Sequence, residues 1–273
     1  MRKVTVLLFV FAAACSHERR NDNAFSWSRD LAAGGTLRIR NTNGTVTVMP
    51  AANGRTARVQ ASTRWRRGNP DHDLNFVAVA EGSDATICVH WGTGTCSATA
   101  YTNHRARLFG IFPRRGTDAR VDFTVEVPPG TRVDVSTVNG ELSITSQSPV
   151  AARTVNGSIH VATAIGPATA RTVNGSVDVR MTTIGGAGDV RAETTNGGAS
   201  LYVPSSVDGR VTMHTVNGTA TSWFALTSPD GSKKRLEGVL GAGTRALVVG
   251  SVNGSVTLGA LDTLGKVLPP AAR

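Results

Sequence analysis

A basic and aromatic segment holds the residues best suited to bind a ligand. Arginine forms paired hydrogen bonds to a phosphate or a carboxylate, and tryptophan stacks on a cation or on the face of a sugar. We therefore expect an anionic glycan or a lipid head group to bind in this segment, which could also cap one end of a repeat stack. The candidate ligand-binding residues are Arg64, Trp65, Arg66, Arg67, Arg105 and Arg107.

Acid-base catalysis has no good candidate residues. His160 and Asp178 occupy equivalent positions of neighbouring repeats, and so do Arg171 and Glu193, which predicts exposed cross-strand pairs contributing under about 1 kcal/mol each. No two acids fall together as the acid and base of a glycosidase must. The six histidines are scattered and no calcium-binding glycine repeat occurs, so we expect no metal and no cofactor. We predict that the protein is not an enzyme, with a carbohydrate-active enzyme as the alternative.

A repeat centred on Asn-Gly predicts the strands that would position these residues. A first copy lies at Asn43. After a long gap, the later copies begin at Asn139 and follow one another at spacings of 17, 18, 22, 21 and 36 residues. A period near twenty is typical of stacked repeats, and the longest spacing indicates one unit with an extra loop. The asparagines expected to form a structural Asn-Gly ladder are Asn139, Asn156, Asn174, Asn196, Asn217 and Asn253.

Each repeat predicts two short strands that meet near the Asn-Gly pair. The apolar residues alternate as in a strand with one buried face, but the alternation shifts just before the Asn, which predicts a corner or a bulge. A two-residue hairpin is rejected because both of its faces would mix polar and apolar residues. We expect the Asn and the Thr or Ser two residues before it to form hydrogen-bonded ladders. Around Asn139 the inward residues would be Val133, Val135, Val138, Leu142 and Ile144.

These features predict an all-β fold, specifically a right-handed parallel β-solenoid with a β-rich excursion inserted near its N-terminal end. The solenoid would span residues 32–273, with the excursion or cap at 49–130 and the regular coils at 131–260. From Thr131 to Ser222 the only aromatic residue is Tyr202, at an outward position. Such an aliphatic interior suits a narrow coil, and a β-sandwich of short strands is the alternative.

The first residues predict export and a membrane anchor. Residues 1–14 form a signal peptide with a positive start and an apolar run too short to span a bilayer. Residues 12–15 resemble the lipobox of bacterial lipoproteins, so Cys15 would carry lipid and residues 15–31 would form a polar tether at the membrane. An ordinary signal cleavage nearby is the alternative. We expect a location in the cell envelope, at the outer membrane or cell surface or facing the periplasm.

The remaining cysteines and the net charge agree with export. Cys88 and Cys96 would form a disulfide in an oxidising compartment, or else remain two buried thiols. The net charge is +10, and it becomes +8 once Arg2 and Lys3 are removed with the signal. Such a surplus attracts anionic glycans, lipid phosphates or nucleic acid, and the export signal makes nucleic acid an unexpected partner.

The order of these motifs resembles a known family. Alternating residues 121–127, then Pro128-Pro129-Gly130 and Thr137-Val138-Asn139-Gly140, resemble the bacterial putative-adhesin family, a domain of unknown function. The resemblance covers about residues 35–260, loosely over 49–120 and 228–243. It implies a β-solenoid on an exported protein or lipoprotein and supplies no catalytic residues. We expect a non-enzymatic lipoprotein that binds or scaffolds at the cell envelope, with an envelope-stress or assembly partner as a further alternative.

Overall fold

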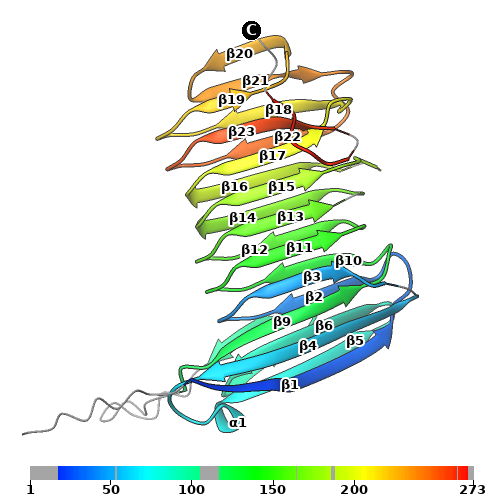
Figure 1. Ribbon diagram of the computed structural model, residues 1–273, viewed down its shortest axis with the longest axis vertical. Coiled ribbons are helices and arrows are strands. Elements are labelled where there is room, and N and C mark those ends of the chain that lie inside the picture. Colours follow the sequence, from blue (N-terminus) through cyan, green and yellow to red (C-terminus); the bar gives the residue numbers. More distant parts are fainter. Residues whose placement is uncertain are drawn as a thin grey trace, which may run out of the picture.

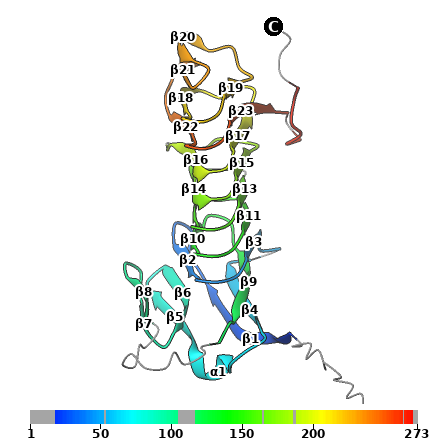
Figure 2. The ribbon, with the colours of Figure 1, turned by 90° about the vertical axis from the view of Figure 1, so that its left-hand side faces the viewer.

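The computed structural model describes residues 18–52, 54–104, 117–163, 165–185, 188–262 and 264–269. Two large β-sheets, which we call A and B, face each other along the length of the molecule (Figures 1 and 2). Both sheets are mixed: parallel pairs fill the middle, and antiparallel pairs lie at the β1 end of sheet A and at both ends of sheet B. The prediction of an all-β fold is confirmed.

Neighbouring strands of each sheet are mostly not consecutive in the chain. From one edge to the other, sheet A contains β1 (Arg19–Asp30), β4 (Thr56–Trp65), β9 (Arg120–Val127), β3 (Val46–Pro50), β11 (Leu142–Ser146), β13 (Ile159–Thr163), β15 (Val177–Met181), β17 (Ala199–Pro204), β23 (Val256–Leu261) and β19 (Ala220–Ser222). Sheet B contains, again from edge to edge, β20 (Thr227–Ser232), β21 (Arg235–Leu240), β18 (Gly209–His214), β22 (Ala246–Gly250), β16 (Val190–Asn196), β14 (Ala168–Asn174), β12 (Val150–Arg153), β10 (Arg132–Ser136), β2 (Thr36–Arg40), β6 (Asp84–Trp91) and β5 (Leu74–Glu81). A separate hairpin joins β7 (Thr93–Cys96) to β8 (Tyr101–His104), and α1 (Pro70–Asp73) precedes β5.

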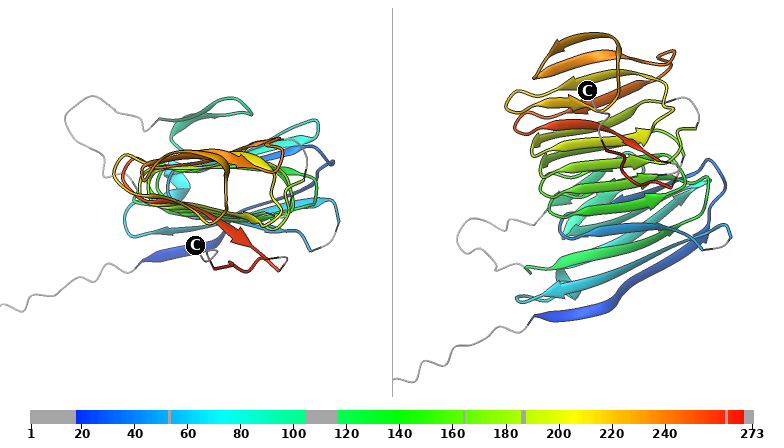
Figure 3. Two further views of the ribbon diagram at one scale, coloured as in Figure 1. Left: turned by 90° about the horizontal axis from the view of Figure 1, so that it is seen from above. Right: turned by 45° about the horizontal axis from the view of Figure 1, so that its top comes forward.

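In the middle of the molecule the chain goes from a strand of sheet B to a strand of sheet A at each Asn-Gly pair. We call each such pair of strands, with its Asn-Gly corner, a passage. Equivalent strands of neighbouring passages pair in parallel. Leu142 of β11 lies opposite Ile159 of β13, and Val133 of β10 lies opposite Val150 of β12. Because side chains alternate across a strand, this register keeps one aliphatic column inside and one polar column outside. The inner columns form a continuous aliphatic core. Figure 3 shows the passages lying over one another in a flattened outline.

The corner at each Asn-Gly pair differs from the prediction. Val173 is 41% exposed, whereas Thr172 beside it is 6% exposed. The expectation that the valine before each Asn points inward was therefore wrong, for Val138 as for Val173. Strand alternation continues unbroken through Thr172, and the shift occurs at Gly175. Gly175 has a φ of 148°, and a Cβ there would lie 2.2 Å from the carbonyl oxygen of Gly157, so only glycine fits.

The last repeat does not stack in sequence order. In sheet B, β22 lies between β16 and β18. In sheet A, β23 lies between β17 and β19. The Asn253 passage therefore separates the Asn196 passage from the Asn217 passage. The long spacing before Asn253 arises because β20 and β21 first extend sheet B beyond β18, after which the chain returns.

The excursion continues both sheets at the opposite end. β4 and β9 extend sheet A, and β5 and β6 extend sheet B. The alternating residues 121–127 noted in the sequence lie in β9. Between the sheets Phe25 stacks on Phe76 at 5.2 Å, and Phe76 meets Phe123 edge-on at 6.4 Å. This aromatic cluster covers the end of the aliphatic core.

Residues 19–30, expected to lie in the polar tether, instead form β1. The strand pairs antiparallel with β4. Phe25 and Trp27 pack against the core, while the residues around them stay exposed. Two alternate aromatic residues are enough to hold an otherwise polar segment at the sheet edge, because large aromatic side chains bury much apolar surface. The signal peptide at residues 1–14 and the lipidation site Cys15 lie outside the described residues.

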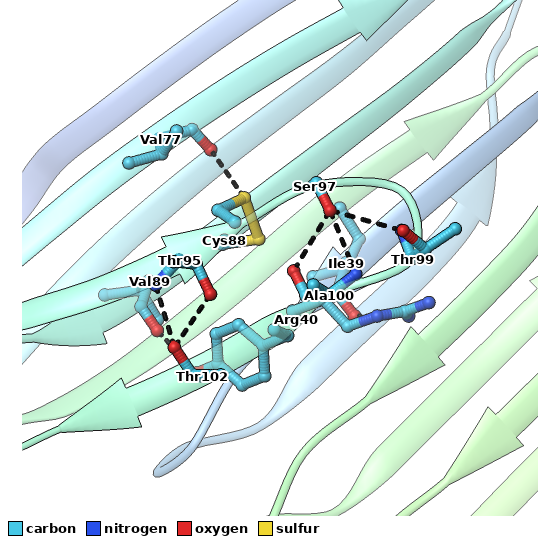
Figure 4. The surroundings of a disulfide bond; sticks show 12 residues. Ile39, Arg40, Val77, Cys88, Val89, Thr95, Ser97, Thr99, Ala100 and Thr102 are labelled. Atoms are coloured by element: carbon cyan, nitrogen blue, oxygen red, sulfur yellow. Dashed lines mark hydrogen bonds between the residues drawn. A yellow bond between two sulfur atoms is a disulfide. The ribbon is translucent and has the colours of Figure 1, made fainter.

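A hairpin covers the outer side of β6. Cys88 and Cys96 form a disulfide, which decides between the two predicted alternatives (Figure 4). The Tyr101 hydroxyl donates to the Val89 carbonyl oxygen at 2.7 Å and meets the Thr42 hydroxyl at 2.9 Å. Burial raises the pKa of Tyr101, so its hydroxyl keeps the proton that it donates. The β7–β8 hairpin is thus joined to β6 by a covalent bond and by a buried hydrogen bond.

Candidate functional site

Arg64 and Trp65, both expected to bind a ligand, do not share one surface. Arg64 donates from Nε to Asp122 Oδ2 at 3.1 Å. Trp65 packs against the core, because consecutive residues of β4 point to opposite faces. A ligand on the outer face would therefore meet a guanidinium already paired with a carboxylate, and no tryptophan ring.

Two further members of that cluster, Arg66 and Arg67, lie just past the end of β4. Arg66 and Arg67 are exposed, and their backbone N–H groups each donate to Asp118 Oδ1 at 2.9 Å. Arg105 and Arg107 lie outside the described residues. The described part of the segment thus forms one end of the two sheets.

The asparagines do come together in one ladder along the corner of the molecule. Each Nδ2 donates to the Oδ1 of the neighbouring passage at 2.7 to 2.8 Å. The ladder gives every passage the same register, so outward side chains at equivalent positions line up in straight columns. In stacking order the ladder runs Asn43, Asn139, Asn156, Asn174, Asn196, Asn253 and Asn217.

The outward pairs expected from the repeat are neighbours. His160 lies opposite Asp178 on the outer face of sheet A. Arg171 Nε lies 2.6 Å from Glu193 Oε2 on the outer face of sheet B. Asp178 accepts a hydrogen bond from Arg180 Nε at 2.8 Å, and that bond raises the pKa of Arg180, which keeps the guanidinium charged. Arg171 with Glu193 and Arg180 with Asp178 thus form ion pairs on solvated faces.

A row of side chains on the outer face of sheet A has better geometry for binding. We call Arg180, Tyr202, Gly259 and Trp223 the aromatic row; it crosses β15, β17, β23 and the end of β19 (Figure 1). The rings of Tyr202 and Trp223 meet edge-on at 5.8 Å and 69°. The Arg180 guanidinium lies 5.5 Å from the centre of the Tyr202 ring. Cation and rings are half-buried or exposed, so they form a continuous surface open to solvent.

Gly259 allows this meeting of the two rings. A Cβ at position 259 would lie 2.5 Å from Tyr202 Cδ1 and 3.1 Å from Trp223 Cε3. Trp223 is held beside it by a backbone hydrogen bond to the Leu258 carbonyl oxygen at 2.9 Å. Any larger residue at 259 would push the rings apart, because side chains cannot overlap at such distances.

The sequence contained a signal for this row. Its members all lie six residues after a repeat Asn, at Arg180, Tyr202, Trp223 and Gly259. The predicted outward pairs use only the positions three before and four after the Asn, so this third outward position was missed. The order of the rings, with Gly259 between them, could not be read from the sequence because the last repeat is inserted out of order.

A cavity of about 410 Å³ lies at the corner opposite the Asn ladder. In other passages the chain crosses this corner from sheet A to sheet B, as between β17 and β18. β23 makes no such crossing, and β22 is entered from β21 instead. We call the space left there the corner cavity; it is lined by Thr182, Pro204, Ser205 and Leu261 together with three charged residues, Asp208, Arg245 and Asp262.

The charged residues of the corner cavity differ in how they are held. Asp208 Oδ1 accepts from the Thr244 N–H at 3.0 Å. That bond and weaker effects, including the charge of Arg245, lower the pKa of Asp208. Asp262 Oδ1 accepts from the N–H groups of Leu264 and Lys266 at 2.9 and 2.8 Å. Backbone N–H groups thus hold both carboxylates at turns.

Neither a metal centre nor a membrane-spanning helix occurs in the described part of the chain. It contains no group of three or more His, Cys, Asp or Glu side chains able to hold a metal ion. None of its helices combines the length and the apolar character needed to cross a bilayer.

Comparisons with known proteins give distant likenesses. A scan against protein-family models finds no match, and a search of curated proteins finds none either. Among solved structures the chain is similar to a "putative cell adhesion protein" from Clostridium sporogenes ATCC 15579, with 10% identity and a TM-score of 0.44 over 86% of this chain and 99% of the other. It is also similar to a "putative adhesin" from Bacteroides fragilis NCTC 9343, with 9% identity and a TM-score of 0.27 over 86% and 96%. TM-scores this low decide neither the fold nor the function of this chain.

Proposed function

We propose that this chain is a non-enzymatic glycan-binding protein of the cell envelope, built as a right-handed parallel β-solenoid, with the aromatic row as its binding surface. The observation that carries the proposal is the meeting of Tyr202 and Trp223 over Gly259, beside the Arg180 guanidinium. Tyr and Trp combine a flat apolar ring with a polar tip, which suits the faces and hydroxyls of sugar rings.

A purely structural role of the row explains less. Aromatic side chains often shield a glycine in a sheet, and the two rings do cover Gly259. Shielding would need only one ring, however. It also gives no reason for a cavity two residues further along the same strands.

The rigidity of the stack supports a binding role. Hydrogen bonds join the asparagines of neighbouring passages, and Thr172, Thr194 and Ser251 each donate a hydroxyl to a glycine carbonyl oxygen of another passage at 2.8 to 2.9 Å. A surface held in place before binding loses little conformational entropy when a ligand arrives.

The location follows from the export signal. We propose that Cys15 carries lipid, which would place β1 near the membrane because β1 begins at Arg19. Tyr202 lies on β17, seven strand spacings from β1 in sheet A. At about 4.8 Å per strand this is about 34 Å, so the aromatic row would lie far from the anchor. Metabolic labelling with a fatty-acid analogue tests the anchor: label should be lost in Cys15→Ser, and equal labelling would contradict it.

A glycan array with the purified full-length chain tests the binding function. We expect selective binding of a set of oligosaccharides, and at least a tenfold loss of affinity, about 1.4 kcal/mol, in Tyr202→Ala and in Trp223→Ala. Thr145→Ala, in the same outward column but away from the row, is the matched control. An empty array, or retention of affinity in both aromatic variants, would contradict the proposal.

A carbohydrate-active enzyme is the second candidate. It is favoured by one observation, that two carboxylates, Asp208 and Asp262, line the same cavity. A general acid needs a raised pKa, whereas the pKa of Asp208 is lowered. Hydrolysis of chromogenic glycosides that is lost in Asp262→Asn would favour the enzyme, and equal background rates in the two proteins would favour binding.

A further inference from the structure

The corner cavity lies beside the aromatic row, further along the strands that the row crosses. Three residues of the cavity lie two positions after a member of the row, on the same strand or just past its end. They are Thr182 after Arg180, Pro204 after Tyr202 and Leu261 after Gly259. Two residues of a strand span about 7 Å, which is comparable to the repeat of an oligosaccharide chain. A glycan that crosses the row in the direction of the strands can therefore place one sugar on the rings and the next in the cavity.

The corner cavity supplies both donors and acceptors for hydroxyl groups. Among the part-buried arginines that the structure describes, Arg245 alone has no carboxylate within ion-pair distance. Its Nε is buried and has no hydrogen-bond partner among the described residues. Asp262 holds a turn through Oδ1, which leaves its Oδ2 as an acceptor. The carboxylate of Asp208, held by backbone N–H groups, adds a second negative charge. Ser205 and Ser206 add exposed hydroxyls at the rim. A volume of about 410 Å³ suits a small molecule.

The charges of the corner cavity decide which sugars suit it. Its lining carries two carboxylates against one guanidinium, a net charge of −1. A ligand carboxylate entering this partly enclosed space would be repelled, since charges interact more strongly there than in open water. A neutral sugar meets no such cost and can hydrogen-bond to all three charged groups, which is the stronger class of hydrogen bond.

We propose that the corner cavity binds a neutral sugar residue of a glycan whose adjoining residue stacks on Tyr202 and Trp223. This inference rests on the proposed glycan-binding function and narrows its ligand class. It differs from the sequence-based expectation of an anionic glycan, which relied on a cluster in which Arg64 is paired with Asp122 and Trp65 packs against the core.

Two matched pairs of oligosaccharides test the ligand class with the full-length chain. The pairs are cellotetraose with its C6-oxidised form, and tetragalacturonate with its carboxyl-reduced form. Calorimetry should show at least tenfold tighter binding of a neutral member over its acidic partner. Asp262→Asn keeps an acceptor for the turn and removes one negative charge, so it should raise affinity for the acidic member at least threefold and change the neutral one little.

A filled cavity tests the place of binding. Ser205→Phe enters the cavity from an exposed position and should weaken neutral binding at least tenfold, whereas Ser176→Phe, exposed near the Asn ladder, should not. Arg245→Gln should weaken it as well, and melting temperatures near the parent value verify folding of each variant. Equal or tighter binding of the acidic members would overturn the inference, and so would normal affinity in Ser205→Phe.

The two proposals fail in different ways. If Tyr202→Ala weakens binding while Ser205→Phe and Arg245→Gln do not, the row binds glycan and the cavity does not, so the inference falls alone. If none of the four oligosaccharides binds and the glycan array is empty, the binding function falls and the inference falls with it.

Discussion

The hydroxyl of Thr172 donates to the carbonyl oxygen of Gly157, one passage away, at 2.9 Å. Thr194 makes the same bond to Gly175 at 2.8 Å, and Thr154 makes it to Gly140 at 3.1 Å. These carbonyl groups lie at the Asn-Gly corner, where regular strand pairing gives way to isolated bridges. The threonine hydroxyls therefore add side-chain hydrogen bonds between neighbouring passages at the corner, beside the backbone bonds there.

Removal of one such hydroxyl should destabilise the stack. Thr172→Val keeps the shape of the side chain but leaves the Gly157 carbonyl without this donor, so the free energy of unfolding should fall by about 1 to 3 kcal/mol. Thr145→Val, the same change at an exposed position of sheet A, should alter it by less than about 0.5 kcal/mol. Urea unfolding of both variants measures the difference, and equal stabilities would contradict a structural role of the hydroxyl.

The corner geometry predicts which valines tolerate a charge. Val179 is fully buried, so Val179→Asp would bury an unpaired carboxylate and should cost about 3 kcal/mol or more. Val173 points outward, and Val173→Asp should cost less than about 1 kcal/mol. Thermal melts compare the two. A collapse of stability in Val173→Asp would restore the inward valine expected from the sequence.

The disulfide should stabilise the hairpin over β6. The bond closes a loop with a sequence separation of 8, and closure of so short a loop is worth about 2 to 3 kcal/mol. In the double variant Cys88→Ala, Cys96→Ala, backbone amides of β7 and β8 should exchange hydrogen faster, while amides of β13 and β15 serve as an internal reference. Unchanged exchange in the hairpin would mean that the Tyr101 hydrogen bonds suffice to hold it.

Acid should weaken the N-terminal end of sheet A through Asp122. Burial acts to raise the pKa of this carboxyl, but hydrogen bonds from the Thr45 N–H, Arg64 and Arg120 outweigh it and leave the pKa lowered. A lowered folded-state pKa gives stability that is present above the ordinary value of 3.8 and is lost as pH falls below it. The loss in unfolding free energy from about pH 5 to about pH 3 should be smaller in Asp122→Asn than in the parent. Asp71→Asn, exposed on α1, is the control and should match the parent.

Much of the fold follows from the repeat pattern. Leu142, Ile159 and Val177 occupy equivalent positions after their asparagines, and they lie opposite one another in sheet A. Their alternation with polar residues is enough to predict strands, register and an aliphatic core. The pairing of Arg171 with Glu193 was predicted in the same way, because outward residues follow the same register.

The corner and the candidate site depend on contacts that no local pattern encodes. Hydrophobicity places Val173 inside and Thr172 outside, but the bond from Thr172 to Gly157 fixes the opposite arrangement. The edge strand β1 was missed because only Phe25 and Trp27 interrupt its polar sequence. The aromatic row brings Tyr202 and Trp223 together across Gly259 through an insertion that reverses the order of two passages.

Saturation-transfer NMR on the aromatic protons tests the central claim, that a glycan stacks on Tyr202 and Trp223, most directly. With cellotetraose or carboxyl-reduced tetragalacturonate bound to the full-length chain, irradiation of the aromatic protons should transfer saturation to the sugar ring protons. The transfer should vanish in the Tyr202→Ala, Trp223→Ala double variant and persist in Thr145→Ala. Sugar signals that stay equally saturated in the double variant would contradict the claim, because the contact would then lie on another aromatic surface.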